Sequence, residues 1–249
     1  MQEIVYHTQF IQEETYWWFL ARNKIVKELI KLYVPEIKGK TVLDVGCGTG
    51  GFSKLISEEY NVICLDTSEI ALEYCKKRNL KNLFYGTLDE FDPGNSKISA
   101  TLFLDVIEHI DDDISVVRKA NEILQKGGYL IATVPAYQWL WSNHDIIHMH
   151  KRRYTKKMFN NLLEEAGFRV IFSSYFNSFL FLPAVLKRFW DNIMKKDNSS
   201  NNPESDVIEP VSPLVNKLFL KIFSFEKNIL SKTSMPFGLS IFTIAKKND

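Results

Sequence analysis

Residues 41–51 of the chain read TVLDVGCGTGG and carry the clearest structural signal. The first five residues form a short run rich in β-branched and apolar side chains, which predicts a buried strand. The glycines that follow allow a tight turn and a close approach of the backbone to a ligand. A helix is expected over roughly 50–60, and the free N–H groups at its start suit an anionic group. This stretch therefore predicts a strand–turn–helix unit that binds a ligand.

Strand and helix signals alternate on both sides of this unit. Further strands are expected at residues 61–65, 83–85, 100–104, 129–134, 168–172 and 238–245, and further helices at 12–34, 68–78, 111–124 and 155–167. Such alternation requires crossover connections and gives a parallel sheet that is covered on both faces. The fold class is therefore α/β, a doubly wound Rossmann-like sheet. Asp111, Asp112 and Asp113 are interpreted as a helix start rather than a metal site, because negative charge complements the positive helix end.

The composition is that of an ordinary globular protein, with 249 residues, 45% of them hydrophobic and 24% charged. A net charge of +1 gives no reason to expect nucleic-acid binding. The charge is unevenly divided, with −6 in residues 1–150 and +7 in residues 151–249, which suits an acidic partner or a membrane surface or simply reflects more lysine. Three cysteines, no signal-peptide pattern and no apolar run near 18 residues lead us to expect a cytoplasmic protein with reduced thiols.

An acidic residue after the second expected strand adds to the evidence from the glycines for a bound cofactor. Asp66 follows Gly46 by about twenty residues and ends the second expected strand, where it can accept hydrogen bonds from both ribose hydroxyls. A nucleoside-containing cofactor is therefore expected. Gly46, Gly48 and Gly51 also satisfy the G-x-G-x-x-G pattern of dinucleotide-binding folds, which is weak evidence on its own. An NAD-dependent or nucleotide-sugar-dependent enzyme therefore stays open at this point.

The glycine stretch VLDVGCGTG at 42–50 is followed by four further motifs: LDVIEHI at 104–110, KGGYL at 126–130, HKRRYT at 150–155 and LLEEAGF at 162–168. In this respect the chain resembles the class I S-adenosylmethionine-dependent methyltransferases, in the small-molecule, ubiquinone-type branch. The resemblance implies S-adenosylmethionine as cofactor, a sheet of about seven strands with the last one antiparallel, and methyl transfer to an oxygen or nitrogen of a small or lipid-linked acceptor. A methyltransferase-like protein that binds the cofactor without catalysis is a further alternative.

The resemblance also implies which residues contact the cofactor: Asp44, Gly46, Cys47, Gly48, Asp66, Leu88 and Asp105, together with Trp18 and Arg22. Gly46 and Gly48 would let the backbone run close to the methionine part of the cofactor. Asp44 would interact with that part directly or through water. Asp66 would hold the ribose, and Asp105 would end the fourth strand beside the cofactor. Leu88 follows the third strand, where the family often has an acidic residue, and would supply an apolar wall instead.

Trp18 and Arg22 lie on an N-terminal helix of the kind that covers the cofactor in similar enzymes. Arg22 could pair with the cofactor's carboxylate. The alternative is that the aromatic residues belong to the core and that Arg22 is solvated.

Histidines supply the candidates for acid–base chemistry. Methyl transfer needs an aligned nucleophile and a site without water, and a hydroxyl or ammonium acceptor also needs a base. His144, His148 and His150 follow the fifth strand among aromatic residues, where parallel sheets place ligands. We take His144 and His150 as the candidate catalytic residues, with a structural or surface role for each as the alternative.

Two patterns could indicate a metal ion. His144 and His148 have the spacing of two ligands on one helical turn, and Asp105, Glu108 and His109 form a second potential cluster. No Glu follows His144, and Pro135 and the aromatic run argue against a regular helix there. We therefore predict no metal site.

We predict a single domain over 1–249, which divides into a cofactor-covering helix at 1–38, a cofactor-binding core at 39–172, a helical insertion or lid at 175–235 with a flexible loop at 195–213, and a final strand at 236–249. Apolar stripes with adjacent lysines mark residues 178–194 and 213–232 as amphipathic helices. These helices could close over an apolar substrate, make peripheral membrane contact, or pack on the sheet or on a second subunit in a homodimer.

Overall fold

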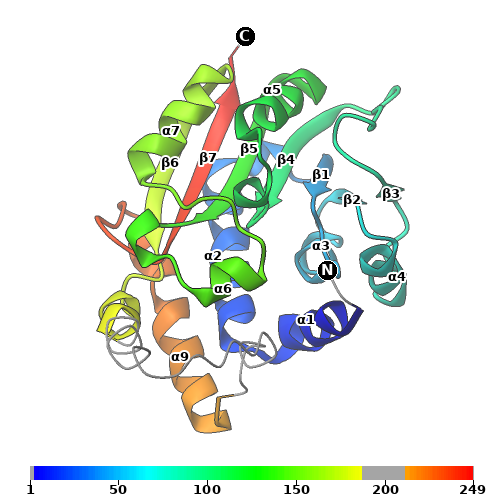
Figure 1. Ribbon diagram of the computed structural model, residues 1–249. Coiled ribbons are helices and arrows are strands. Elements are labelled where there is room, and N and C mark those ends of the chain that lie inside the picture. Colours follow the sequence, from blue (N-terminus) through cyan, green and yellow to red (C-terminus); the bar gives the residue numbers. More distant parts are fainter. Residues whose placement is uncertain (1–2, 187–210, 249) are drawn as a thin grey trace.

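The computed structural model describes residues 3–186 and 211–248 (Figure 1). Within them, seven strands form one sheet in the order β3-β2-β1-β4-β5-β7-β6. The strands are β1 (Thr41–Val45), β2 (Asn61–Asp66), β3 (Leu83–Tyr85), β4 (Ile98–Leu104), β5 (Leu124–Pro135), β6 (Phe168–Phe176) and β7 (Ser240–Lys247). β7 runs antiparallel to both β5 and β6, and the other pairs are parallel. The predicted α/β fold with an antiparallel last strand is confirmed.

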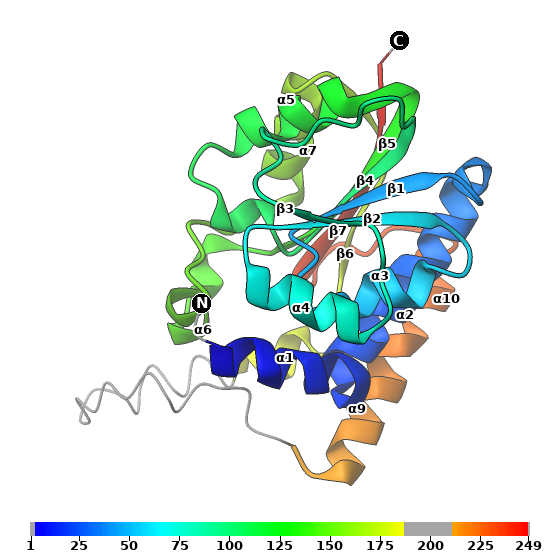
Figure 2. The same cartoon turned by 90° about the vertical axis from the view of Figure 1, so that its right-hand side faces the viewer.

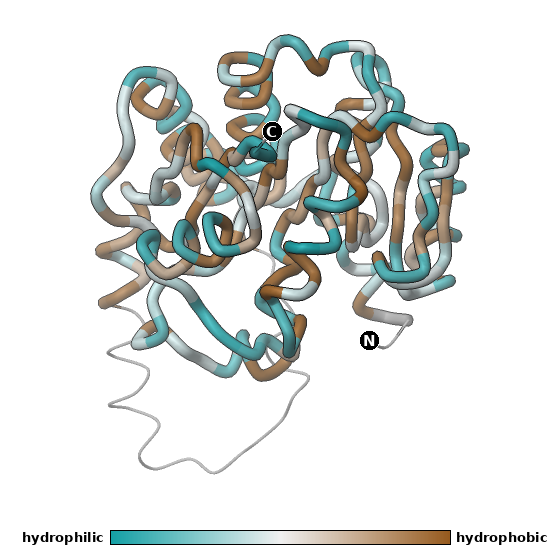
Figure 3. Tube along the Cα trace, turned by 90° about the horizontal axis from the view of Figure 1, so that it is seen from above, coloured by the Kyte–Doolittle hydropathy of each residue, from teal (hydrophilic) through white to brown (hydrophobic). Residues whose placement is uncertain are grey.

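Helices cover both faces of this sheet (Figure 2). They are α1 (Glu3–Thr15), α2 (Trp17–Tyr33), α3 (Gly51–Ile56), α4 (Glu69–Lys77), α5 (Asp113–Ile123), α6 (Asn143–Ile147), α7 (Lys156–Glu165), α9 (Pro213–Phe225) and α10 (Lys227–Leu230), with short 3-10 turns at Pro35–Ile37, Ile107–His109 and Gln138–Leu140. Successive strand residues point to opposite faces, so Val42 joins the apolar core under α2 and α3, and Leu43 joins the core under α5 and α7. In Figure 3 the helices alternate between hydrophilic and hydrophobic residues, as expected when one face lies on a sheet.

Three helices begin where the sequence predicts them, and each start has a side-chain cap. Ser68 accepts a hydrogen bond from the backbone N–H of Ala71, and Thr155 accepts one from Met158. Asp112 accepts one from the N–H of Ser115, so the run of three aspartates marks a helix start, as predicted.

The N-terminal region differs from the prediction of a single helix over 12–34. The structure has two helices, α1 and α2, because Tyr16 between them adopts an extended backbone with φ −89° and ψ 131°. The apolar spacing of α2 was recognised, whereas α1 is only weakly amphipathic and begins far earlier than expected. The break at Tyr16 lets α1 turn away from α2 and lie beside α3 and α4 (Figure 2).

The described part of the segment between β6 and β7 contains a helical turn and the helices α9 and α10. Residues 181–186 form a helical turn, and α9 packs along α2, with the ring of Trp17 5.3 Å from that of Phe219 and 6.0 Å from that of Phe223. The side-chain oxygen of Asn216 also accepts a hydrogen bond from the N–H of Trp17. Of the predicted loop 195–213, residues 195–210 lie outside the described residues. No helix among the described residues is long and apolar enough to cross a membrane.

Glu226, directly after α9, binds the backbone of the chain after β6, and its ionisation should make the free energy of unfolding depend on pH. Its side chain is fully buried, and Oε1 accepts hydrogen bonds from the N–H groups of Ser178 and Phe179, at 2.7 and 2.9 Å. Burial raises the pKa of Glu226 to about 7. Because the pKa in an unfolded chain is about 4.3, the folded state binds this proton more tightly.

The free energy of unfolding should therefore fall as the pH rises from about 5 to 8, by up to about 3 kcal/mol from Glu226. Glu226→Gln retains an acceptor and cannot ionise, so this variant should lose that decline. Urea unfolding at three pH values measures the effect, with Glu164→Gln, an exposed carboxyl on α7, as the matched control. If the free energy of unfolding falls with pH as steeply in Glu226→Gln as in the wild type, Glu226 is not the group responsible.

Candidate cofactor and acceptor site

The glycine turn, residues 46–51, connects β1 to α3 and lies against Val106, just after β4. Gly46 has a φ of +65°, and a Cβ atom placed on it would lie 2.8 Å from Cγ2 of Val106. Gly48 has a φ of +56°, and a Cβ there would lie 2.8 Å from Nε2 of Gln9 on α1. A side chain at Gly46 would therefore be strained and would collide with the segment after β4.

Asp66 ends β2 and bridges the turn to the start of α4. Its Oδ2 accepts a hydrogen bond from the N–H of Gly48 at 2.8 Å, and its Oδ1 accepts one from the N–H of Ser68 at 2.9 Å. Burial raises the pKa of this carboxyl. Two carboxylate oxygens offer about four acceptor positions, so Asp66 retains capacity for ribose hydroxyls. The structure thus adds a role in holding the turn to the predicted role in binding.

Asp44 is engaged by the protein itself. It is buried, and its Oδ2 accepts a hydrogen bond from Oγ of Ser53 on α3 at 2.6 Å. Burial raises the pKa of Asp44 to about 8. This contact ties β1 to α3, and the expected interaction with the cofactor stays a prediction. Leu88 is also buried, in the apolar core that contains Val45 and Leu65.

Trp18, Arg22 and Asp105 come together, as residues expected around one ligand should. Nη2 of Arg22 lies 2.7 Å from Oδ2 of Asp105, and the Arg22 guanidinium lies 5.2 Å from the centre of the Trp18 ring. Arg22 is buried, so the alternative of a solvated Arg22 was wrong. Asp105 has a φ of +62°, a strained conformation for a residue other than glycine that is typical of functional sites.

Helix α1 lies directly on the glycine turn, and sequence reasoning missed this. Oε2 of Glu13 accepts hydrogen bonds from Oγ1 of Thr49 at 2.5 Å and from the N–H of Gly51 at 3.0 Å. Arg78, which directly follows α4, pairs with the same Glu13 oxygen at 3.2 Å and donates to the carbonyl oxygen of Thr49. The N–H at the start of α3, which we expected to suit an anionic group of a ligand, therefore binds Glu13. No local pattern signals a contact between residues this far apart.

His150 belongs to a buried ion-pair network. Its Nδ1 lies 2.8 Å from Oδ1 of Asp145, and Asp145 also binds Nε and Nη2 of Arg153 at 2.7 and 3.0 Å and the N–H of Ser142 at 2.8 Å. These partners hold the pKa of Asp145 well below its usual range. A fixed carboxylate at Nδ1 orients the ring and makes Nε2 the basic nitrogen. Asp145 and Arg153 were not identified from the sequence. His144 lies on α6, but its side chain is outside the described part of the structure.

Glu108 and His109 lie beside His150. The rings of His109 and His150 are 4.7 Å apart, and burial lowers the pKa of His109. Glu108 is fully buried, and its two carboxyl oxygens have no hydrogen-bond partner among the described residues. Burial raises the pKa of Glu108 well above its usual range.

Glu108, His109 and His150 each offer one ligand atom, and these atoms lie within 4.8 Å of one another. A carboxylate with two imidazoles suits a divalent cation such as zinc, manganese or iron. This donor set partly matches the second cluster considered from the sequence, with His150 in place of Asp105. The absence of a metal therefore stays a prediction.

Aromatic residues flank Gln138, whose side-chain oxygen accepts a hydrogen bond from the N–H of Arg153 in this network. The rings of Tyr137 and Tyr175 stack at 5.1 Å, and Phe181 packs on Tyr137 and Trp139 at 5.8 and 6.2 Å. Large apolar side chains in three stretches of the chain, 139–149, 179–186 and 214–237, are exposed to solvent: Trp139, Ile146, Met149, Phe179, Leu182, Leu186, Leu214, Leu218, Phe225 and Phe237. We call this set the apolar rim. Seven of these ten side chains belong to α6, residues 179–186 and α9, which lie at one end of the molecule, beyond the carboxyl ends of the parallel strands (Figure 1).

Comparison with known proteins identifies a methyltransferase domain in this chain. The model of a methyltransferase domain family matches residues 17–172. A probable S-adenosylmethionine-dependent methyltransferase of Mycolicibacterium smegmatis is 27% identical over 164 residues, which are 64% of this chain and 62% of the relative. A ubiquinone biosynthesis O-methyltransferase of Rickettsia typhi is 31% identical over 121 residues, 45% of this chain and 48% of the relative. The matches thus span about half to three-fifths of these relatives.

Solved structures share the fold. The crystal structure of a SAM-dependent methyltransferase from Archaeoglobus fulgidus superposes with a TM-score of 0.58 and 19% identity, covering 95% of this chain and 98% of the other. One from Thermotoga maritima, described as a possible histamine N-methyltransferase, has a TM-score of 0.58 and 20% identity, covering 98% and 100%. At this identity the likeness concerns the architecture alone.

Proposed function

The chain belongs to the class I S-adenosylmethionine-dependent methyltransferases, and from this premise we propose that it transfers a methyl group to an oxygen or nitrogen of an apolar, small or lipid-linked acceptor. The observation that carries the proposal is the oriented Asp145–His150 pair, with the exposed apolar side chains of Ile146 and Met149 between the two residues in the chain. A base among apolar side chains suits an acceptor that is mostly apolar and loses one proton.

On the cofactor side, the residues present fit S-adenosylmethionine. Asp66 retains acceptor capacity for the ribose, and the turn at Gly46 admits no side chain. Leu88 and Trp18 would provide apolar walls. The bound cofactor would supply an electrophilic methyl group whose leaving group needs no proton. Because Arg22 and Asp105 form an ion pair, one of them would contact the cofactor while the other holds it in orientation.

On the acceptor side, His150 would take the proton from a hydroxyl or ammonium group through Nε2. Asp145 would keep the ring oriented and stabilise the charge that His150 gains. Tyr137 and Phe181 would hold the acceptor and help to exclude water. The Rickettsia typhi relative, named as an O-methyltransferase, favours oxygen as the acceptor atom. His144 remains a second candidate for the same role.

We further propose that the acceptor is reached at the inner face of the cytoplasmic membrane. Leu214 is 82% exposed and Leu218 is 53% exposed on α9, and Lys217 and Lys221 are exposed on the same helix. Apolar side chains next to lysines suit the surface of an anionic bilayer. The three cysteines are free thiols, which a reducing compartment such as the cytoplasm maintains.

Vesicles that contain anionic lipid should therefore co-sediment with the protein at low salt. The double variant Leu214→Ser/Leu218→Ser should weaken this binding at least 10-fold, because each buried leucine contributes about 1.5–3 kcal/mol. Leu32→Ser, an exposed leucine on α2 outside the apolar rim, is the matched control and should bind as the wild type does. Methyl transfer from labelled S-adenosylmethionine to apolar and polar acceptors completes the test.

The acceptor proposal is wrong if small polar acceptors are methylated as well as apolar ones. The membrane proposal is wrong if the wild type stays in the supernatant. Gel filtration that shows a dimer disrupted by the double variant would instead make this surface a subunit interface.

A further inference from the structure

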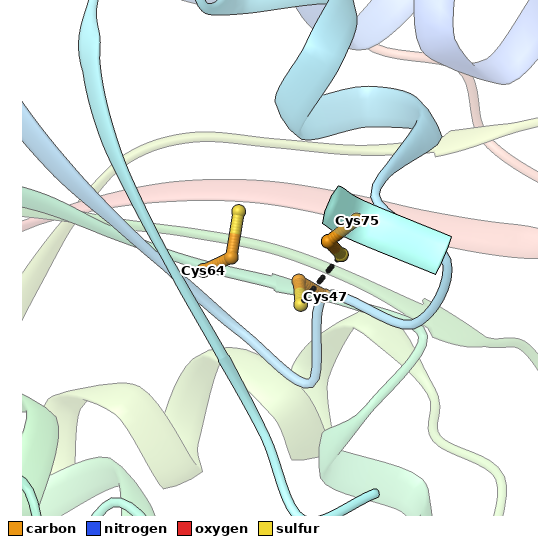
Figure 4. Close-up of side chains that lie close together, drawn as sticks. All are labelled: Cys47, Cys64 and Cys75. Atoms are coloured by element: carbon orange, nitrogen blue, oxygen red, sulfur yellow. Dashed lines mark hydrogen bonds between the residues drawn. The ribbon is translucent and has the colours of Figure 1, made fainter. Parts of the chain in front are cut away.

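Three cysteines that are separated in the chain lie close together next to the glycine turn. Cys47 lies within the turn, Cys64 in β2 and Cys75 on α4 (Figure 4). Their exposed fractions are 9%, 0% and 0%, and all three are free thiols. The three sulfur atoms lie within 4.8 Å of one another, and Sγ of Cys47 lies 3.8 Å from Sγ of Cys75.

The spacing of these sulfur atoms matches a shared cation better than a disulfide. Three thiolates around one ion at about 2.3 Å would lie about 4 Å from one another. The observed separations of 3.8 Å for one pair and at most 4.8 Å for all therefore need shifts below about 1 Å. A disulfide between Cys47 and Cys75 would require the sulfur atoms to approach to about 2.05 Å. A cation could thus be bound with less change in the surrounding backbone.

The cysteines also contact the turn itself. Sγ of Cys75 donates to the carbonyl oxygen of Gly48 at 3.4 Å, and Sγ of Cys47 lies 3.7 Å from the same oxygen. A Cβ atom on Gly50 would lie 2.8 Å from Sγ of Cys75. On its other side, the peptide N–H of Gly48 donates to Asp66. A change at the sulfur atoms would therefore also act on the backbone of Gly48, which borders the predicted cofactor site.

We propose that Cys47, Cys64 and Cys75 form a site for one thiophilic d10 cation, Zn²⁺ or Cu⁺, and that an occupied site lowers the affinity for the cofactor. Thiolate ligands select these two ions over hard cations such as Mg²⁺. Each sulfur that becomes a ligand exchanges its S–H bond for a metal–sulfur bond and releases one proton to solvent, with no change of oxidation state. The coupling rests on the proposed function, whereas the cation site does not.

The coupling follows from the loss of the thiol protons. A metal-bound sulfur can no longer donate to the carbonyl oxygen of Gly48, and Cys47 is drawn towards β2 and α4. The turn then loses part of the support that holds it in position for a ligand. Coupling of two sites is reciprocal, so bound cofactor should weaken the cation to the same extent.

The direct test is a titration of the reduced full-length chain with Zn²⁺ and, separately, with Cu⁺, each in competition with a chromophoric chelator. One equivalent should bind, and Cd²⁺ as a spectroscopic substitute should give the sulfur-to-metal charge-transfer absorption in the near ultraviolet. Cys64→Ala should abolish this absorption, and Cys47→Ala provides a second variant should the first not fold. His109→Ala is the matched control, since it removes a donor of the other potential cation site and should leave the thiolate absorption intact.

Calorimetry with S-adenosylmethionine then tests the coupling, with about a 10-fold loss of affinity expected at one equivalent of cation. This loss should be absent in Cys64→Ala. The cation site is refuted if the wild type gives no more charge-transfer absorption than Cys64→Ala. Binding of the cation without a change in cofactor affinity would refute the coupling. A cation that binds to a chain with no affinity for S-adenosylmethionine would refute the proposed function and leave the cation site standing.

Discussion

Replacing His150 by alanine should lower the turnover of methyl transfer by about 100-fold or more and leave the affinity for S-adenosylmethionine nearly unchanged. His150 is the one predicted catalytic residue whose side chain is described, and Asp145 fixes its ring from the Nδ1 side. The loss should therefore appear in kcat, because the base acts on the acceptor and not on the cofactor. Asp145→Asn should also lower turnover, since an amide can favour the wrong tautomer of the ring.

The matched control is Lys151→Ala, which alters the neighbouring residue. The Lys151 side chain pairs with Asp111, 3.2 Å away at the protein surface, so its removal should leave turnover within a few-fold of the wild type. If His150→Ala loses no more than Lys151→Ala, catalysis by His150 as a base is wrong. A wild-type activity that a chelator abolishes and a divalent cation restores would make His150 a ligand together with Glu108 and His109.

Asp66→Ala should weaken binding of S-adenosylmethionine by roughly 10–100-fold, which corresponds to about 1.5–3 kcal/mol for the loss of charged hydrogen bonds. The variant removes the expected ribose contact and also the acceptor for the N–H groups of Gly48 and Ser68. Asp66→Asn, which keeps one carbonyl oxygen, should give an intermediate affinity. Asp89→Ala removes an exposed carboxylate shortly after β3 and is the matched control.

Calorimetry gives these affinities, and thermal unfolding of each variant separates lost binding from a loosened turn. Equal affinities for the wild type and Asp66→Ala would remove Asp66 from the cofactor site. Tighter binding of NAD than of S-adenosylmethionine by the wild type would argue for a dinucleotide enzyme and against the proposed function.

Local signals in the sequence were sufficient for the fold and for the strand–turn–helix unit on which the predicted cofactor contacts lie. The β-branched run before Gly46 forms β1, and the capping residues Ser68 and Thr155 begin α4 and α7. Each signal depends on neighbours within a few residues, as strand periodicity, turns and helix caps do. Asp66 could be identified because the strand–helix–strand unit sets its distance from the glycine turn.

The proposed acceptor side could be predicted only in part, because its residues acquire their chemistry from the way the chain packs around them. Nothing in the sequence near His150 distinguishes it from His148, and it is the buried pair of Asp145 and Arg153 that orients its ring. Glu108 was recognised as one member of a potential cluster, but its complete burial without a hydrogen-bond partner among the described residues depends on the packing around it. Burial and pKa are properties of the assembled core.

The sequence by itself determined the α/β class, the strand–turn–helix unit and the position of Asp66, since these follow from short-range sterics and hydrogen bonding. Only the tertiary structure decided that Glu13 binds the N–H of Gly51 and that three cysteines meet beneath the turn. The reason is that such contacts join residues from separate elements. Their energies depend on the packing of those elements, which no local pattern encodes.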